Sequence, residues 1–107
     1  MLANHHTQAC LDAWVNCENV LFNIRNQFKS FSARTVKTVD ECAQICMGLF
    51  ELFNSKKTNF KGLALLCVGI CEECAEVCER YDDPLLQQCA ETCRFCSITI
   101  SELATAD

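Results

Sequence analysis

Apolar residues and cysteines recur along most of the chain at steps of three and four residues. The pattern is clearest in two runs of cysteine: Cys67, Cys71, Cys74 and Cys78, followed by Cys89, Cys93 and Cys96. Residues at these steps lie on one side of an α-helix, and that side faces the core when the helix is amphipathic. We therefore predict helices whose buried stripe consists of cysteine where most proteins have leucine.

Polar turns and capping signals divide the chain into four predicted helices of about 20 residues each. We expect them at about residues 4–26, 38–53, 59–81 and 84–103. Thr38 and Glu41 form a capping-box pattern that would begin the second helix, and Thr58 or Asn59 would cap the third. Asp82-Asp83-Pro84 offers a cap followed by a proline at the first position of the fourth helix.

The connections between these helices are short, which favours antiparallel neighbours. The sequence has only 3 glycines and 1 proline, and it has few alternating β-branched runs, so we predict an all-α fold. The predicted architecture is an antiparallel up-down-up-down four-helix bundle whose core is lined by cysteines. Residues 1–107 are expected to form a single domain.

Every cysteine in the chain falls on the inward stripe of a predicted helix. Steps of four, three and four residues give each helix four inward positions. The eleven cysteines on these positions are Cys10, Cys17, Cys42, Cys46, Cys67, Cys71, Cys74, Cys78, Cys89, Cys93 and Cys96. Large apolar residues take the other positions: Trp14, Leu21, Leu49, Phe53 and Ile100. Cysteines that served only as small buried hydrophobic residues would not need to occupy these positions so regularly. All eleven cysteines are therefore candidate metal ligands.

Stacking these positions into layers of an antiparallel bundle predicts an uneven distribution of thiols. One layer would hold four facing thiols, those of Cys17, Cys46, Cys74 and Cys93. The layer beside it would hold Cys42, Cys78, Cys89 and Leu21. Core residues such as Trp14, Leu49, Phe53 and Ile100 would partly fill the other half of the axis. We therefore expect one half of the bundle axis to be the main metal compartment, and the other half to be partly filled by apolar side chains.

The charge of the chain limits its partners. The formal net charge is −5 and no basic stripe is visible, so nucleic acid is not an expected partner. The sequence contains no stretch of about 18 uninterrupted apolar residues, so we do not expect a membrane-spanning helix. The start of the sequence lacks the basic and apolar regions of a secretory signal, so we expect a cytoplasmic protein. Thiols stay reduced there, and abundant cysteine then indicates metal or redox chemistry.

Thiolates are soft ligands that select soft ions, and Cu(I) is the softest common biological candidate. Two cysteines one helical turn apart have Cβ atoms about 5–6 Å apart, close enough to share an ion. Such pairs occur at Cys42/Cys46, Cys67/Cys71, Cys74/Cys78 and Cys89/Cys93. Each cation would also offset the charge of a buried thiolate. The predicted function is therefore to bind Cu(I) and to store or buffer it.

In its cysteine pattern the chain resembles the four-helix-bundle copper storage proteins. The resemblance rests on the repeated Cys-x-x-x-Cys pairs, on the histidines ahead of Cys10, and on residues 66–78 and 88–96, and it covers nearly the whole chain. It implies a bundle that binds many Cu(I) ions through core thiolates and assembles as a homotetramer. It also implies a cytosolic location for members that lack a signal.

Two other readings of the cysteines remain open from the sequence. A disulfide-stapled helical interaction module would pair Cys78 with Cys89 and Cys74 with Cys93, since facing helices can satisfy disulfide geometry. The odd number of cysteines is against it. A zinc or iron–sulfur protein would use the four-thiol layer, although zinc ligands more often lie on turns.

The remaining candidate residues are few. We interpret His5 and His6 as a polar start of the chain, with the alternative that His6, one turn before Cys10, admits an ion at the end of the bundle. Met47 lies one step off the stripe and is interpreted as a packing residue. No enzyme is predicted, because nucleophilic cysteine needs an adjacent base and both histidines lie at one terminus. The sequence does not show whether the phenylalanines at 22, 28, 31 and 50 face the core or an oligomer.

Overall fold

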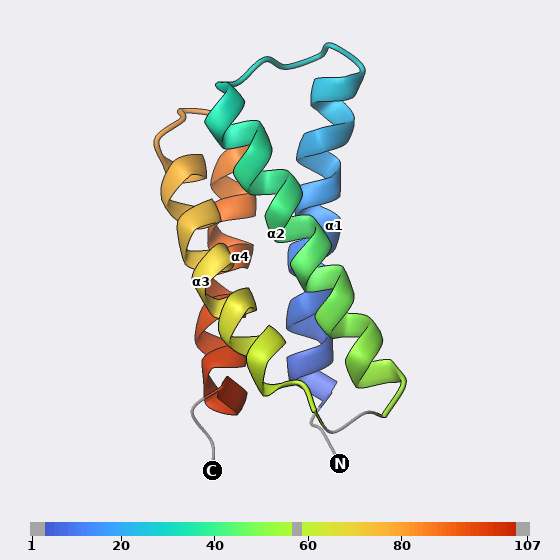
Figure 1. Ribbon diagram of the computed structural model, residues 1–107. Coiled ribbons are helices and arrows are strands. Elements are labelled where there is room, and N and C mark those ends of the chain that lie inside the picture. The colour runs from blue at the N-terminus through green and yellow to red at the C-terminus, as the bar shows by residue number, and fades with distance from the viewer. Residues whose placement is uncertain (1–3, 57–58, 105–107) are drawn as a thin grey trace.

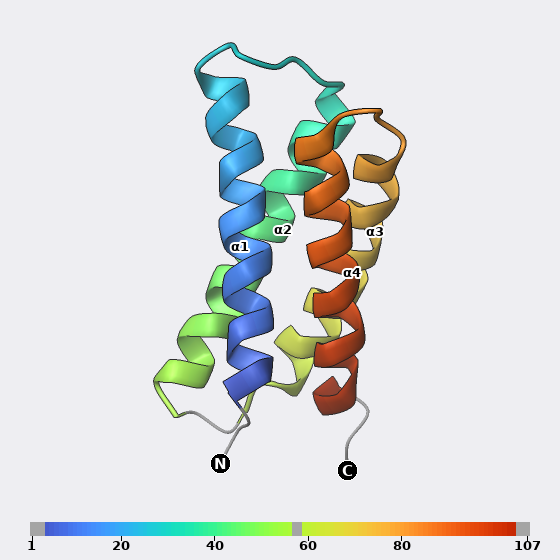
Figure 2. The ribbon, with the colours of Figure 1, turned by 180° about the vertical axis from the view of Figure 1, so that it is seen from behind.

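Four helices make up the part of the chain that the computed structural model describes, residues 4–56 and 59–104. They are α1 (Asn4–Arg25), α2 (Ala33–Asn54), α3 (Lys61–Glu79) and α4 (Pro84–Ala104). The helices run alternately up and down, and both chain ends lie at the same end of the bundle (Figures 1 and 2). The predicted all-α up-down-up-down bundle is confirmed.

Each helix packs against two neighbours, so the four helices enclose one axis. α1 contacts α2 and α4, and α3 contacts α2 and α4. All eleven cysteines are fully buried along this axis. The largest fully buried side chains around them include Leu49, Leu86 and Ile100. The stripe predicted from the sequence is therefore the core of the bundle.

Asp83 fixes the start of α4, as the sequence predicts. Its Oδ1 accepts hydrogen bonds from the backbone N–H groups of Leu85, at 2.9 Å, and of Leu86, at 3.4 Å. Pro84 is the first residue of the helix, where a missing N–H costs nothing. The Nζ of Lys29 donates to Asp83 Oδ2 at 2.8 Å, which ties the α1–α2 connection to the α3–α4 connection.

The predicted start of α2 at Thr38 is wrong. The helix begins at Ala33, and Ser32 is the cap, since its Oγ accepts a hydrogen bond from the backbone N–H of Thr35 at 3.2 Å. Thr38 is buried inside the helix, where its side chain continues the inward stripe. The serine offers a capping oxygen earlier in the chain, so the helix extends back to it.

The predicted cap of α3 is also wrong for Asn59, while Thr58 lies outside the described residues. Phe60 occupies the cap position of α3 and makes no side-chain capping bond. Its ring packs edge-on against Phe53 with ring centroids 5.4 Å apart. An aromatic contact between α2 and the start of α3 therefore takes the place of a polar cap.

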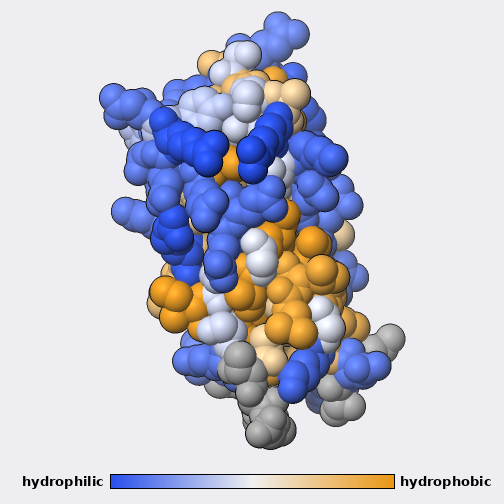
Figure 3. Space-filling view, turned by 60° about the vertical axis from the view of Figure 1, so that its left-hand side comes forward, coloured by the Kyte–Doolittle hydropathy of each residue, from blue (hydrophilic) through white to orange (hydrophobic). Residues whose placement is uncertain are grey.

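The outer face of α3 and α4 is divided into a polar half and an apolar half. Figure 3 shows hydrophilic residues over the upper half and hydrophobic residues over much of the lower half. Glu79 and Arg94 form an ion pair between the two helices. The exposed large apolar side chains of these helices include Leu65, Leu66 and Ile98, called here the α3/α4 apolar patch. Phe95 is also exposed, but it lies on the side of α4 toward α1, beside Asp12 and Asn16.

The four phenylalanines that the sequence left open divide into two kinds. Phe31 and Phe50 are partly buried and pack against the core, whereas Phe22 and Phe28 are exposed.

Across residues 4–56 and 59–104, none of the helices has the length and apolar character that crossing a bilayer requires.

Replacing Asp83 tests the closure at the connection end of the bundle. Asp83→Ala should lower the free energy of unfolding of the reduced, metal-free protein by about 1 kcal/mol, because a helix cap is lost. Urea denaturation measures the change. Asp83→Asn is the matched control, since it keeps a capping oxygen while removing the charge, and it should recover only part of the loss, the remainder being the contribution of the charge that pairs with Lys29.

The loss of stability in Asp83→Ala should also depend on pH. The hydrogen bond from Lys29, followed by those from the N–H groups of Leu86 and Leu85, lowers the pKa of Asp83. A lowered folded-state pKa gives stability that is present above the ordinary aspartate pKa of about 3.9 and is lost as the pH falls through the lowered value. An Asp83→Ala deficit that stays constant down to strong acid would contradict this assignment.

Candidate metal centre

The eleven cysteines all carry free thiols, and each has an exposed fraction of 0%. Their side chains come from all four helices and point to the common axis. The shortest Sγ–Sγ distance given by their contacts is 3.6 Å, between Cys46 and Cys71. A disulfide needs about 2.05 Å, so these sulfurs are in van der Waals contact and not bonded.

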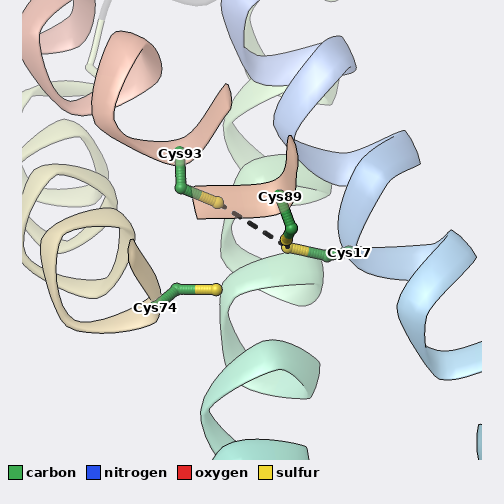
Figure 4. A group of neighbouring side chains, drawn as sticks. All are labelled: Cys17, Cys74, Cys89 and Cys93. Carbon is green, nitrogen blue, oxygen red and sulfur yellow. Dashed lines mark hydrogen bonds between the residues drawn. The ribbon is translucent and has the colours of Figure 1, made fainter. Parts of the chain in front are cut away.

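One group of four thiols joins α1, α3 and α4. The Sγ atoms of Cys17, Cys74, Cys89 and Cys93, called here the Cys17 cluster, lie within 4.8 Å of one another. Cys17 Sγ is 3.8 Å from Cys89 Sγ and 3.9 Å from Cys93 Sγ. Figure 4 shows Cys74 and Cys93, from the neighbouring helices α3 and α4, pointing toward the same space as Cys17 from α1. Four sulfurs therefore face a volume that suits metal ions.

A second group of four thiols joins α2, α3 and α4. Cys46, Cys67, Cys71 and Cys96, called here the Cys46 cluster, also have Sγ atoms within 4.8 Å of one another. Cys67 Sγ lies 3.9 Å from both Cys46 Sγ and Cys71 Sγ. The α3 pair Cys67 and Cys71 therefore provides two neighbouring ligands, as its one-turn spacing predicts.

Cys42 connects the two clusters. Its Sγ lies 3.8 Å from Cys71 Sγ in the Cys46 cluster and 3.8 Å from Cys93 Sγ in the Cys17 cluster. The two outermost cysteines extend the network. Cys10 hydrogen-bonds to Cys67, and Cys78 Sγ lies 4.0 Å from Cys74 Sγ. The eleven thiols thus form one connected column along the axis.

The predicted layers are wrong for α2. Cys46 was expected opposite Cys17 and Cys93, but it lies in the other cluster, and Cys42 instead lies beside Cys93. The helix is displaced by about one turn from the predicted register. Moving α2 along the bundle by four residues puts Cys46 where Cys42 was, so both registers place a cysteine at the same inward position. Cysteine spacing alone therefore cannot determine the register of α2.

The predicted asymmetry of the core is also wrong. The half of the axis that was expected to be filled by apolar residues contains the four-thiol Cys46 cluster. Trp14 does not enter the axis. It is only partly buried and packs against Phe50 with ring centroids 6.0 Å apart, while Ala13 is fully buried. Leu49 and Ile100 are buried as expected, but they do not interrupt the column.

Thiols this close together cannot all be ionised, because thiolates repel one another and lose hydration on burial. The hydrogen bonds that Cys10 donates to Cys67 and Cys96, together with burial, raise the pKa of Cys10. Hydrogen bonding to Cys42 is the largest cause of the raised pKa of Cys71. Cys96, which accepts from Cys10, has its pKa lowered to about 6. A cation that binds this column must therefore displace protons.

The histidines do not form a loose polar start as interpreted from the sequence. His5 and His6 both lie in the first turn of α1, and His6 is buried. The Nε2 atoms of His5 and His6 lie 3.4 Å and 3.0 Å from Glu102 Oε1. Sequence reasoning missed Glu102, which lies 96 residues from His6 and is brought near only by the antiparallel packing of α1 and α4.

The chain as a whole is similar to known proteins. Residues 2–105 match the model of a family described as copper storage protein. The chain belongs to the copper storage protein family. This confirms the family resemblance and the function, copper storage, predicted from the sequence.

A solved structure shares the fold of this family member. The chain is similar to a Cu(I)-bound copper storage protein, BsCsp3, with a TM-score of 0.86 and 24% sequence identity. The alignment covers 95% of this chain and 97% of that chain. A search of curated proteins gave no match.

Counting thiols tests the reduced column against the disulfide alternative. The protein purified without added oxidant should show eleven reactive thiols after denaturation, measured with a chromogenic disulfide reagent. The native protein should react slowly, because each thiol is fully buried and is reached only when the bundle opens. A denatured count that is lower by two or four would instead indicate disulfides such as Cys78–Cys89.

Proposed function

We propose that this chain stores Cu(I) as cargo in the thiol column, with all eleven cysteines as ligands. The observation that carries the proposal is the continuity of the column: fully buried sulfurs in contact at 3.6–4.0 Å run from one cluster into the other. The similar structure is titled Cu(I)-bound, which supports the choice of ion.

The sulfur positions suit the coordination that Cu(I) prefers. With a metal–thiolate bond of about 2.3 Å, sulfurs lie about 4 Å apart around a trigonal ion and about 4.6 Å apart across a linear one. The single Sγ atom of Cys42 lies 3.8 Å from the Sγ of Cys71 and 3.8 Å from the Sγ of Cys93, close to the trigonal value. The 4.8 Å limit within each cluster includes the linear value. Small rotamer changes would therefore be enough for loading.

Shared ligands favour storage of several ions over a single structural site. Cys71 belongs to both the Cys46 cluster and the group with Cys42, and Cys93 belongs to both that group and the Cys17 cluster. A thiolate that bridges two ions links neighbouring sites. If every thiolate bridged two ions of coordination number two, the limit would be about one Cu(I) per thiolate, or about eleven.

We further propose a non-catalytic protein in the cytoplasm. The family description names storage, and free buried thiols persist in a reducing compartment. Cell fractionation checks the location. Recovery in the cytosol supports the proposal, whereas recovery outside the cell or with membranes contradicts it.

A homotetramer is the proposed assembly. The α3/α4 apolar patch supports it, because Leu66 and Ile98 are 60% and 68% exposed, and burial of such side chains in an interface is favourable. Ile98→Glu should give a smaller species in sedimentation velocity. Phe28→Glu is the control, since Phe28 is 67% exposed on the α1–α2 connection, away from this patch. A wild-type chain that sediments as a monomer would contradict the proposal.

Cu(I) titration of the reduced protein against a competing chelator tests the storage function. The wild type should bind several ions per chain. Cys71→Ala/Cys93→Ala should lose clearly more capacity than Cys10→Ala/Cys78→Ala, because the first pair removes thiols that join groups and the second removes thiols at the ends. Both variants remove two sulfurs and leave small apolar side chains, so they are matched.

Three results would count against this account. Binding of a single Cu(I) or none would exclude storage. Equal losses in the two double variants would show that the sites are independent and that no thiolate bridge links them. Tight stoichiometric Zn²⁺ in the isolated protein would favour the zinc alternative, for which a four-thiol cluster is sufficient.

A further inference from the structure

A second group of metal-ligating side chains, without sulfur, lies at the end of the bundle that holds both chain ends. It consists of His5 and His6 from the first turn of α1 and Glu102 from the last turn of α4. One ligand atom from each lies within 4.8 Å of the other two. Both imidazoles approach the same oxygen, Glu102 Oε1.

One of the three ligands is held firmly and two are accessible. The His6 side chain is 10% exposed, while His5 and Glu102 are 58% and 60% exposed. The His6 Nδ1 is buried and makes no hydrogen bond within the described residues, so Nε2 is the ring nitrogen with a partner. The rings of His5 and His6 lie against each other with centroids 4.1 Å apart. A buried anchor with two open partners is suited to an ion that arrives from solvent.

The spacing of the ligand atoms fits a tetrahedral ion. Metal–nitrogen and metal–oxygen bonds of about 2.0–2.2 Å place neighbouring ligand atoms about 3.3 Å apart. The two Nε2–Oε1 distances are 3.4 Å and 3.0 Å. An ion between them would relieve the competition of two imidazoles for one oxygen and would leave one coordination position for water.

The donor types decide which ion fits. Imidazole and carboxylate suit borderline divalent ions, with Cu²⁺ bound more tightly than Zn²⁺, whereas Cu(I) prefers the thiolates. The positive end of the α1 dipole lies here beside the negative end of the α4 dipole, so the helix ends offset each other and the carboxylate sets the local charge.

We propose that His5, His6 and Glu102 form a binding site for a borderline divalent cation, separate in its ligands from the Cu(I) column. The site uses no cysteine and goes beyond the storage function. The chain would thus sort copper by oxidation state: reduced ions in the sulfur core, and divalent ions on nitrogen and oxygen at the end of the bundle.

The test uses Zn²⁺, which has no redox chemistry with thiols, added to the full chain after it has been loaded with Cu(I). Imidazole ¹⁵N signals and calorimetry should show one Zn²⁺ per chain bound to both histidines. Glu102→Gln, His5→Gln and His6→Gln should each weaken Zn²⁺ binding at least about tenfold. Glu91→Gln, the same change at an exposed position of α4, should leave binding unchanged.

Because His6 is buried, folding of the His6→Gln variant is checked by circular dichroism. If that variant does not fold, the variants of the two exposed ligands, His5 and Glu102, decide the test. Unshifted imidazole signals, or Zn²⁺ affinity that Glu102→Gln leaves intact, would overturn the site. The Cu(I) content is measured first, and imidazole signals report on the histidines whatever the thiols hold. Failure of the storage function and failure of this site are therefore seen separately.

Discussion

Contact between buried thiols along one axis is the constraint on which the rest of this structure depends. As neutral groups, thiols are small and polarizable and pack as a hydrophobic core, so the bundle closes without metal. As thiolates, the same groups need a cation, because buried charges only 3.6–4.0 Å apart would repel one another strongly. The contacts that close the empty bundle are therefore the contacts that ligate the cargo.

The two ends of the column differ in a way that follows from the topology. At the end with the α1–α2 and α3–α4 connections, the Tyr81 hydroxyl accepts the Ser32 N–H at 3.1 Å and lies 3.0 Å from Thr35 Oγ1, while Lys29 pairs with Asp83. These bonds join the two connections over that end. The opposite end has the chain termini and the His6–Glu102 contact. Closure at one end and nitrogen and oxygen ligands at the other give the bundle a direction.

The sequence was sufficient to predict the helices, their up-down order and the burial of every cysteine, because a period of 3.6 residues is visible wherever side chains alternate between core and solvent. It was not sufficient for the register of α2. A displacement by one turn exchanges Cys42 and Cys46, so both registers satisfy the pattern. The cap of α2 was also not determined by the sequence: Ser32 and Thr38 are both good capping residues, and the pattern does not show which one is used. Glu102 had no local signal, since its partners come from the other end of the chain.

The central claim is that sulfur alone ligates the stored Cu(I) and that thiolates bridge these ions into one column. X-ray absorption at the copper edge of the Cu(I)-loaded protein tests it most directly. The account predicts a first shell of sulfur only, together with copper–copper scattering from ions that share a thiolate. A first shell containing nitrogen or oxygen, or sulfur coordination with no copper–copper scattering at full loading, would contradict it.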